Sequence, residues 1–203
     1  MNLKPIITFI TFLFLLASCK ESNEQLLDKA YKLSKQKKYD KAIEINTEVI
    51  KRNSKLQLAY YNRGFDYMTI KNYPKALADF NKVMALQSHG NLIITYNKDS
   101  PLTDEEARAQ VPYNDALYQR AQVKFYMDSL KSSYLDFQTL INNNYEEKSN
   151  CIIWQGTLWV KDGKTDKACD YFAKAKQFAL TEDDKHEADE MIKTYCGQPN
   201  NNR

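Results

Sequence analysis

The strongest constraint on the fold is a pattern of small and aromatic residues that occurs twice without a gap. Residues 59–84 and 116–141 align at an offset of 57, so that Gly64 is matched by Ala121 and Phe80 by Phe137. Each copy has two apolar-periodic segments, which indicate two amphipathic helices. In the first copy the break between them contains Pro74, which suits the first turn of a helix. Each copy is therefore predicted to be a helix hairpin, with Gly64 packed against Ala76 in the first.

This pattern resembles the tetratricopeptide repeat, a helix–turn–helix unit of 34 residues. Residues 57–90 and 114–147 carry it, and so do residues 23–56 and 149–182, although Asn46 stands at the aromatic position of the first repeat and predicts looser packing there. The resemblance implies an all-α fold: an α-solenoid of about four hairpins within residues 23–196, closed by a capping helix at residues 183–196 and followed by a tail at 197–203. Residues 91–113 interrupt the register as an insertion, in which Thr103 and Glu106 predict a short capped helix.

Two of the repeats share a pair of charged residues that the other two lack. Arg63 and Asp79 recur at the equivalent positions Arg120 and Asp136. We expect an ion pair between the two helices of each repeat, with a structural role.

The chain begins like a secreted protein. Lys4 precedes an apolar run at residues 5–16 that is too short to span a bilayer comfortably. The following Leu16-Ala17-Ser18-Cys19 resembles the lipobox of bacterial lipoproteins. That resemblance implies a signal peptide at residues 1–18, a lipid on Cys19 and a tether at residues 19–22. An ordinary signal peptide with an incidental cysteine is the alternative.

The residue after the lipobox bears on location. By the same resemblance, Lys20 favours the outer membrane over the inner membrane, with the periplasmic face and the cell surface both open. Taken together, the chain resembles tetratricopeptide-repeat lipoproteins of Gram-negative, Bacteroidetes-like type.

Three cysteines remain once Cys19 is lipidated, and a compartment outside the cytoplasm permits disulfides. In the repeat stack that the resemblance implies, the end of the capping helix lies near the start of the preceding second helix. We therefore expect a Cys169–Cys196 disulfide, with Cys151 unassigned. Three buried free thiols are the alternative.

Several kinds of chemistry have no support in the sequence. The net charge of +3 is spread in mixed sign, which argues against a nucleic-acid partner. His89 and His186 stand far apart and no cysteine pair has zinc spacing, so no metal or other cofactor is predicted. No nucleophile–base pair is evident. We expect a protein that is not an enzyme.

The resemblance implies that the first helix of each repeat lines a concave face that binds a protein or peptide partner. Aromatic side chains are common anchors at such surfaces, although these residues could instead pack between repeats. The leading hypothesis is a membrane-anchored adaptor; a small-molecule or glycan-binding lipoprotein and a structural accessory subunit are the alternatives. The predicted partner-binding residues are Tyr31, Tyr61, Asn62, Phe65, Tyr118, Gln122, Phe125 and Trp154, on a face that also presents Leu27, Thr69, Ile153 and Thr157.

Overall fold

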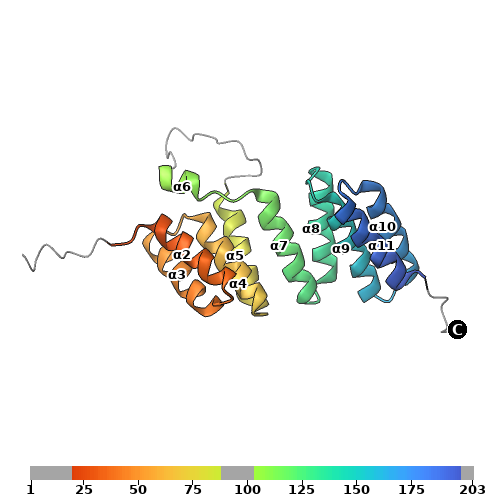
Figure 1. Ribbon diagram of the computed structural model, residues 1–203, viewed down its shortest axis with the longest axis horizontal. Coiled ribbons are helices and arrows are strands. Elements are labelled where there is room, and N and C mark those ends of the chain that lie inside the picture. Colours follow the sequence, from red (N-terminus) through yellow and green to blue (C-terminus); the bar gives the residue numbers. More distant parts are fainter. Residues whose placement is uncertain (1–19, 88–102, 198–203) are drawn as a thin grey trace, which may run out of the picture.

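The computed structural model describes residues 20–87 and 103–197, and every regular element in these ranges is a helix (Figure 1). The predicted leader, Cys19, the first part of the insertion and residues 198–203 lie outside the described residues. The hairpins are α2 (Asn23–Lys35) with α3 (Tyr39–Arg52), α4 (Gln57–Thr69) with α5 (Tyr73–Leu86), α7 (Tyr113–Tyr126) with α8 (Leu130–Asn142), and α9 (Lys148–Lys161) with α10 (Thr165–Phe178). The short α6 (Asp104–Arg108) precedes α7, and α11 (Glu182–Tyr195) comes last.

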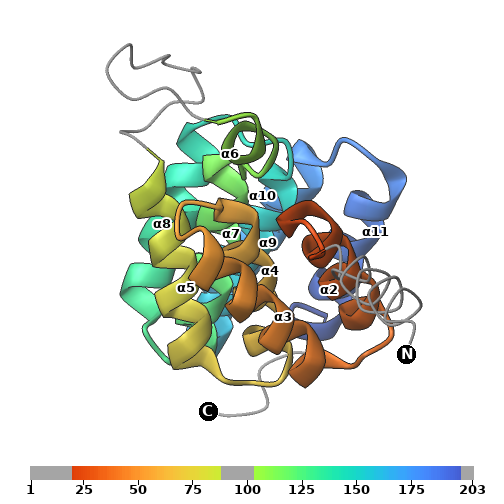
Figure 2. The ribbon, with the colours of Figure 1, turned by 90° about the vertical axis from the view of Figure 1, so that its left-hand side faces the viewer.

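The hairpins stack in chain order into an elongated solenoid (Figure 1). The second helix of one hairpin packs on the first helix of the next: α3 on α4, α5 on α7, and α8 on α9. The last helix, α11, packs mainly on α10. Figure 2, which looks along the stack from its N-terminal end, shows α6 at one edge of the first two hairpins. The predicted all-α solenoid of four hairpins and a capping helix is confirmed.

The seam inside each of the last three hairpins is formed by a small residue facing a fully buried phenylalanine. A Cβ built on Gly64 would lie 3.1 Å from Phe80 Cε1 and 3.2 Å from Asp79 Cβ. The phenylalanine ring one turn farther along α5 than Ala76 therefore lies beside the glycine, and the predicted packing of Gly64 on the fully buried Ala76 stays a prediction. Gly156 faces Phe172 in the same way, and even more closely.

The first hairpin departs from this seam. Asn46 occupies the phenylalanine position and is fully buried, yet neither atom of its amide has a hydrogen-bond partner among the described residues. The apolar core beside it is built from aliphatic residues, Leu26, Leu27, Val49, Leu56 and Ala59, together with Ala109 from the insertion.

The turn within each hairpin follows one backbone rule. Lys37, Lys71, Asp128 and Gly163 have φ between 58° and 73°, the left-handed region. After each of them, the next N–H bonds to the carbonyl five residues back, as in Asn72 N to Tyr67 O at 2.8 Å. This is the bonding of the Schellman motif, which caps a helix and reverses the chain. Only the fourth hairpin uses glycine there.

Both predicted ion pairs are present, and they are more buried than exposed. Arg63 donates to both carboxylate oxygens of Asp79 at 2.7 and 2.8 Å, and Arg120 does the same to Asp136 at 2.7 and 2.9 Å. Lys124 adds a second cation to Asp136 at 2.7 Å. Each bidentate pair locks one helix of a hairpin to the other.

Both ends of the described array are tied down. Cys169 at the start of α10 is joined to Cys196 at the end of α11 by a disulfide, the pairing that the sequence predicts, whereas Cys151 is a buried free thiol. At the other end, Arg52 donates to the carbonyl oxygen of Glu21 at 2.8 Å, and Lys29 pairs with the Glu21 carboxylate at 3.1 Å. The chain just before α2 is therefore held against the first hairpin.

Candidate functional site

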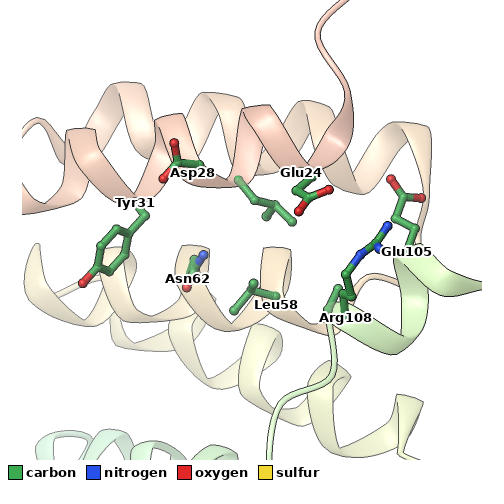
Figure 3. A pocket seen from close by; sticks show the side chains of 9 residues that line it. Glu24, Asp28, Tyr31, Leu58, Asn62, Glu105 and Arg108 are labelled. Carbon is green, nitrogen blue, oxygen red and sulfur yellow. The ribbon is translucent and has the colours of Figure 1, made fainter.

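A pocket of about 390 Å³ lies between the first helices of the first two hairpins and the short helix of the insertion (Figure 3). Its walls come from three elements far apart in the sequence. They are Glu24, Leu27, Asp28 and Tyr31 on α2, Leu58 and Asn62 on α4, and Glu105, Arg108 and Ala109 on or just after α6.

The spacing of the α2 residues explains why they meet. Residues 24, 27, 28 and 31 are three or four apart, so they fall on one face of a helix. The buried floor of the pocket is apolar, because Leu27 and Ala109 are almost inaccessible to solvent. Tyr31, by contrast, is 53% exposed at the rim. The pocket thus combines an apolar base with charged and aromatic edges.

The wall contributed by α6 is fixed by main-chain and side-chain bonds to α4. Leu58 N–H donates to the carbonyl of Ala109 at 2.9 Å, and Val111 N–H donates to Oε1 of Gln57 at 3.0 Å. Gln57 is itself buried, and its Nε2 donates to Gln110 at 3.2 Å. This part of the insertion is therefore a fixed wall of the site.

Helix α6 forms where the sequence predicts it, because both halves of its capping box are made. Thr103 Oγ1 accepts from the Glu106 N–H at 3.2 Å, and Glu106 Oε2 accepts from the Thr103 N–H at 3.0 Å. Glu105 reaches back to the first hairpin, where it accepts from Asn53 Nδ2 at 3.3 Å. The five-residue helix is too short to persist alone, and its contacts with α3 and α4 hold it in place.

Only two of the eight predicted partner-binding residues, Tyr31 and Asn62, line this pocket. Phe65 lies one turn beyond Asn62 on α4 and is 43% exposed, so it extends the apolar rim without entering the pocket. Tyr61 is half-buried and packs edge-on against Phe80 with ring centroids 5.8 Å apart. Gln122 is half-buried on α7.

The other three predicted residues, Tyr118, Phe125 and Trp154, pack on one another between the third and fourth hairpins. Trp154 stacks on Phe137 at 5.8 Å, meets Phe125 edge-on at 5.2 Å, and donates its indole N–H to the Tyr118 hydroxyl at 3.2 Å. Burial raises the pKa of Tyr118 to about 12. These three side chains therefore pack between repeats, which was the alternative to a role in binding a partner.

Seven of the nine pocket residues were not among the predicted partner-binding residues, although one of the seven, Leu27, was expected on the same concave face. The charged residues Glu24 and Asp28 share a helix face with Leu27 and Tyr31, and this spacing could have identified them. Leu58 stands at the position equivalent to Glu24, one repeat of 34 residues later, so the same reasoning could have predicted it. The residues from α6, namely Glu105, Arg108 and Ala109, had no such signal, because nothing in the sequence states where an insertion docks.

Two features that would indicate catalysis, a metal-binding cluster and an activated cysteine, are absent from the described residues. Residues 20–87 and 103–197 contain no group of three or more His, Cys, Asp or Glu side chains that could hold a metal ion. Burial raises the pKa of the Cys151 thiol to about 12, so this cysteine is protonated at neutral pH and is not an activated nucleophile. None of the described helices is long and apolar enough to cross a bilayer.

No protein-family model matches the chain, and no curated protein matches it either. Solved structures do resemble it. MamA from Desulfovibrio magneticus RS-1 is 16% identical with a TM-score of 0.59, covering 78% of this chain and 76% of that one. YrrB, described as a TPR protein with an unusual peptide-binding site, is 18% identical with a TM-score of 0.56, covering 94% and 93%. At these identities the likeness concerns the fold, and it agrees with the stacked hairpins, the glycine–phenylalanine seams and the capping helix: the chain is an α-solenoid with the tetratricopeptide-repeat fold.

Proposed function

We propose that this chain is a lipid-anchored, non-catalytic adaptor that binds a segment of a protein partner at the cell envelope. The observation that carries the proposal is the pocket between α2, α4 and α6, which joins an apolar floor to an exposed tyrosine. Interfaces are commonly anchored by aromatic side chains that bury apolar area and keep one polar end. Tyr31 and Phe65 stand at equivalent positions of successive repeats, so together they offer such anchors along one face.

Two further points support this function. The fold is a repeat solenoid, which presents an extended concave surface. The structurally similar YrrB is described as having a peptide-binding site. For the anchor, the support is the sequence Leu16-Ala17-Ser18-Cys19, and Lys20 supports placement at the outer membrane.

The test is photo-crosslinking in membranes of the native host. Benzoylphenylalanine replaces Tyr31 in one variant and Leu135 in another, since Leu135 on α8 is also 53% exposed but lies outside the pocket. We expect a discrete protein adduct at position 31 and none at position 135. Equal adducts at both positions, or none at either, would contradict an adaptor that uses this pocket.

The volume of the pocket also suits a small ligand, since such sites span about 300–1,000 Å³. A small-molecule or glycan-binding lipoprotein is therefore the second candidate. It predicts binding on a glycan or metabolite array that is lost in the Leu58→Trp variant, together with no protein adduct at position 31.

The anchor has its own test. Metabolic labelling with an alkyne-bearing palmitate should label the wild-type chain and leave the Cys19→Ser variant unlabelled. The same variant should leave the membrane fraction. Unchanged membrane retention of Cys19→Ser would refute the lipid anchor without bearing on the pocket.

A further inference from the structure

We infer that the pocket is selective for a chain segment carrying one basic side chain two residues away from a large apolar one. This inference rests on the proposed function and names the chemistry of the partner. It follows from how charge is distributed along the pocket, from the size of the pocket, and from the position of α6.

The charges of the pocket differ between its two ends. At the α6 end, the carboxylates of Glu24 and Glu105 lie with the guanidinium of Arg108 (Figure 3). Two negative charges against one positive charge leave one negative charge there. Among the described residues, neither Glu24 nor Arg108 has an ion-pair partner within 4.0 Å. One basic side chain from a partner would balance this end.

The other end of the pocket already holds its cations. Asp28, in the middle of the α2 face, is paired with Lys32 at 2.6 Å. Lys35 Nζ lies 5.2 Å from the centre of the Tyr31 ring, a cation–π contact. A second basic group from a partner would be repelled at this end, whereas an apolar side chain can lie against Leu27, Leu58 and the open part of the tyrosine ring. The pocket therefore has a direction, from a basic position at α6 to an apolar position at Tyr31.

The dimensions limit the segment. Glu24 and Tyr31 are seven residues apart on α2, which corresponds to about 10 Å along the helix axis. An extended chain advances about 3.3 Å per residue, and side chains two residues apart point the same way. The pocket thus takes about three residues, with the basic and apolar side chains at positions i and i+2.

The segment around α6 encloses the basic position. It supplies Glu105 and Arg108 to its wall, and Ala109 to the floor. Without it, Glu24 alone would leave the same single negative charge, but this end of the pocket would lose its second wall. The repeats therefore supply the attracting charge and the apolar surface, and the insertion closes the pocket around them.

The first experiment measures peptide selectivity directly. The purified full-length chain in detergent is applied to an array of several thousand random heptapeptides. We expect enrichment of sequences with Lys or Arg two residues from Leu, Phe, Tyr or Trp, and weaker binding as NaCl rises from 50 to 500 mM, because screening weakens exposed charge pairs. Binding without enrichment of basic residues would overturn the inference and leave the adaptor function standing. Binding to no peptide, together with a glycan or metabolite hit, would overturn both.

The second experiment uses charge variants of opposite expected sign on the best-bound array peptide. Glu24→Lys should weaken binding about fivefold or more, since it removes one attraction and adds one repulsion. Arg108→Gln should strengthen binding a few-fold, because it removes the cation that competes for the two carboxylates; a folding defect does not produce a gain. The matched control is Glu44→Lys, an exposed acid on α3 outside the pocket, which should leave affinity unchanged. Weaker binding by Arg108→Gln would contradict the proposed basic position.

Discussion

Asp66 is a carboxylate placed inside the junction between the first two hairpins. It is 1% exposed, Ser34 Oγ donates to its Oδ1 at 2.5 Å, and Oδ2 has no partner among the described residues. Burial raises the pKa of this carboxyl from its ordinary value of 3.8 to about 6. The folded protein thus holds a proton that the unfolded chain releases between about pH 4 and pH 6.

The stability should therefore fall as the pH rises through this window. Well below pH 4 the carboxyl is protonated in both states, so its ionisation does not affect stability. Above pH 6 the folded state must carry a buried charge. A shift of about two pKa units corresponds to about 3 kcal/mol. Asp66→Asn can still accept the Ser34 bond, so it should be more stable than wild type by up to this amount at pH 7.5 and nearly equal at pH 4. Urea unfolding at both pH values measures this, and parallel pH profiles for the two proteins would refute it.

The two glycines that face a phenylalanine differ in how well they should tolerate replacement by alanine. A Cβ on Gly156 would lie 2.4 and 2.7 Å from atoms of the Phe172 ring, which is fully buried and stacked on Tyr195. Gly156→Ala should cost about 1–3 kcal/mol of unfolding free energy, as overpacking does.

Gly64→Ala is the matched comparison. Its Cβ would lie 3.1 Å from Phe80, and alanine gains up to about 1 kcal/mol of helix propensity over glycine. We expect a change within about 1 kcal/mol. Thermal unfolding of both variants distinguishes the seams; an equal loss for the two would show that the closer approach at Gly156 is not what limits packing there.

At the scale of elements, α6 depends on one small buried residue. Ala109, which directly follows α6, is 3% exposed in the core of the first hairpin, whereas Ala107 on α6 is exposed. Ala109→Glu should detach α6, because a buried carboxylate without a partner is costly. The Leu58 amide donates to the carbonyl of Ala109, and the Val111 amide donates to the side chain of Gln57. Both amides should then exchange with solvent at least tenfold faster.

Ala107→Glu provides the control, with exchange at Leu58 and Val111 unchanged. Because α6 has only five residues, its loss should leave the helix content by circular dichroism nearly the same in both variants. Global unfolding of Ala109→Glu would contradict the separate docking of this element.

The elements themselves follow from the sequence, and their docking does not. The helices and their turns could be predicted because local rules specify them: the 3.6-residue apolar period, Pro74 in a first turn, and the capping box of Thr103 and Glu106. The ion pair of Arg63 with Asp79 could also be predicted, because the same two residue types recur 57 residues later in the next aligned repeat. The pocket could not be predicted in this way, since α6 is held in place by the bonds of Gln57 and by the burial of Ala109, and neither follows the repeat pattern. For Trp154 the limit is a different one: its repeat position predicts a place on the concave face, but its ring stacks on Phe137.

At the scale of the whole molecule, the C-terminal end is closed by the Cys169–Cys196 disulfide, across a sequence separation of 27 residues. In the chain-entropy model such a loop contributes roughly 3–4 kcal/mol. Repeat arrays are stabilised by each unit and its neighbours, so the effect should be concentrated in the last hairpin and α11.

Cys169→Ser should therefore lower the melting temperature and accelerate exchange in α10 and α11, with little change in α2–α5. The addition of a reductant should have the same effect on wild type and none on the variant. Cys151→Ser is the control for substituting a cysteine that forms no disulfide. Uniformly faster exchange along the whole array would contradict this local effect.

The bonds of Arg52 and Lys29 to Glu21 determine how far the body can stand from an anchor. With a lipid on Cys19, only Lys20 separates the acylated residue from one that is fastened to the first hairpin. Two extended residues reach about 7 Å. Glu24, at the α6 end of the pocket, follows three residues after Glu21, so the pocket would open at the height of the lipid headgroups. A partner embedded in the same membrane can present a segment at that height directly, whereas a large assembly held farther from the bilayer would have to extend a flexible arm down to it.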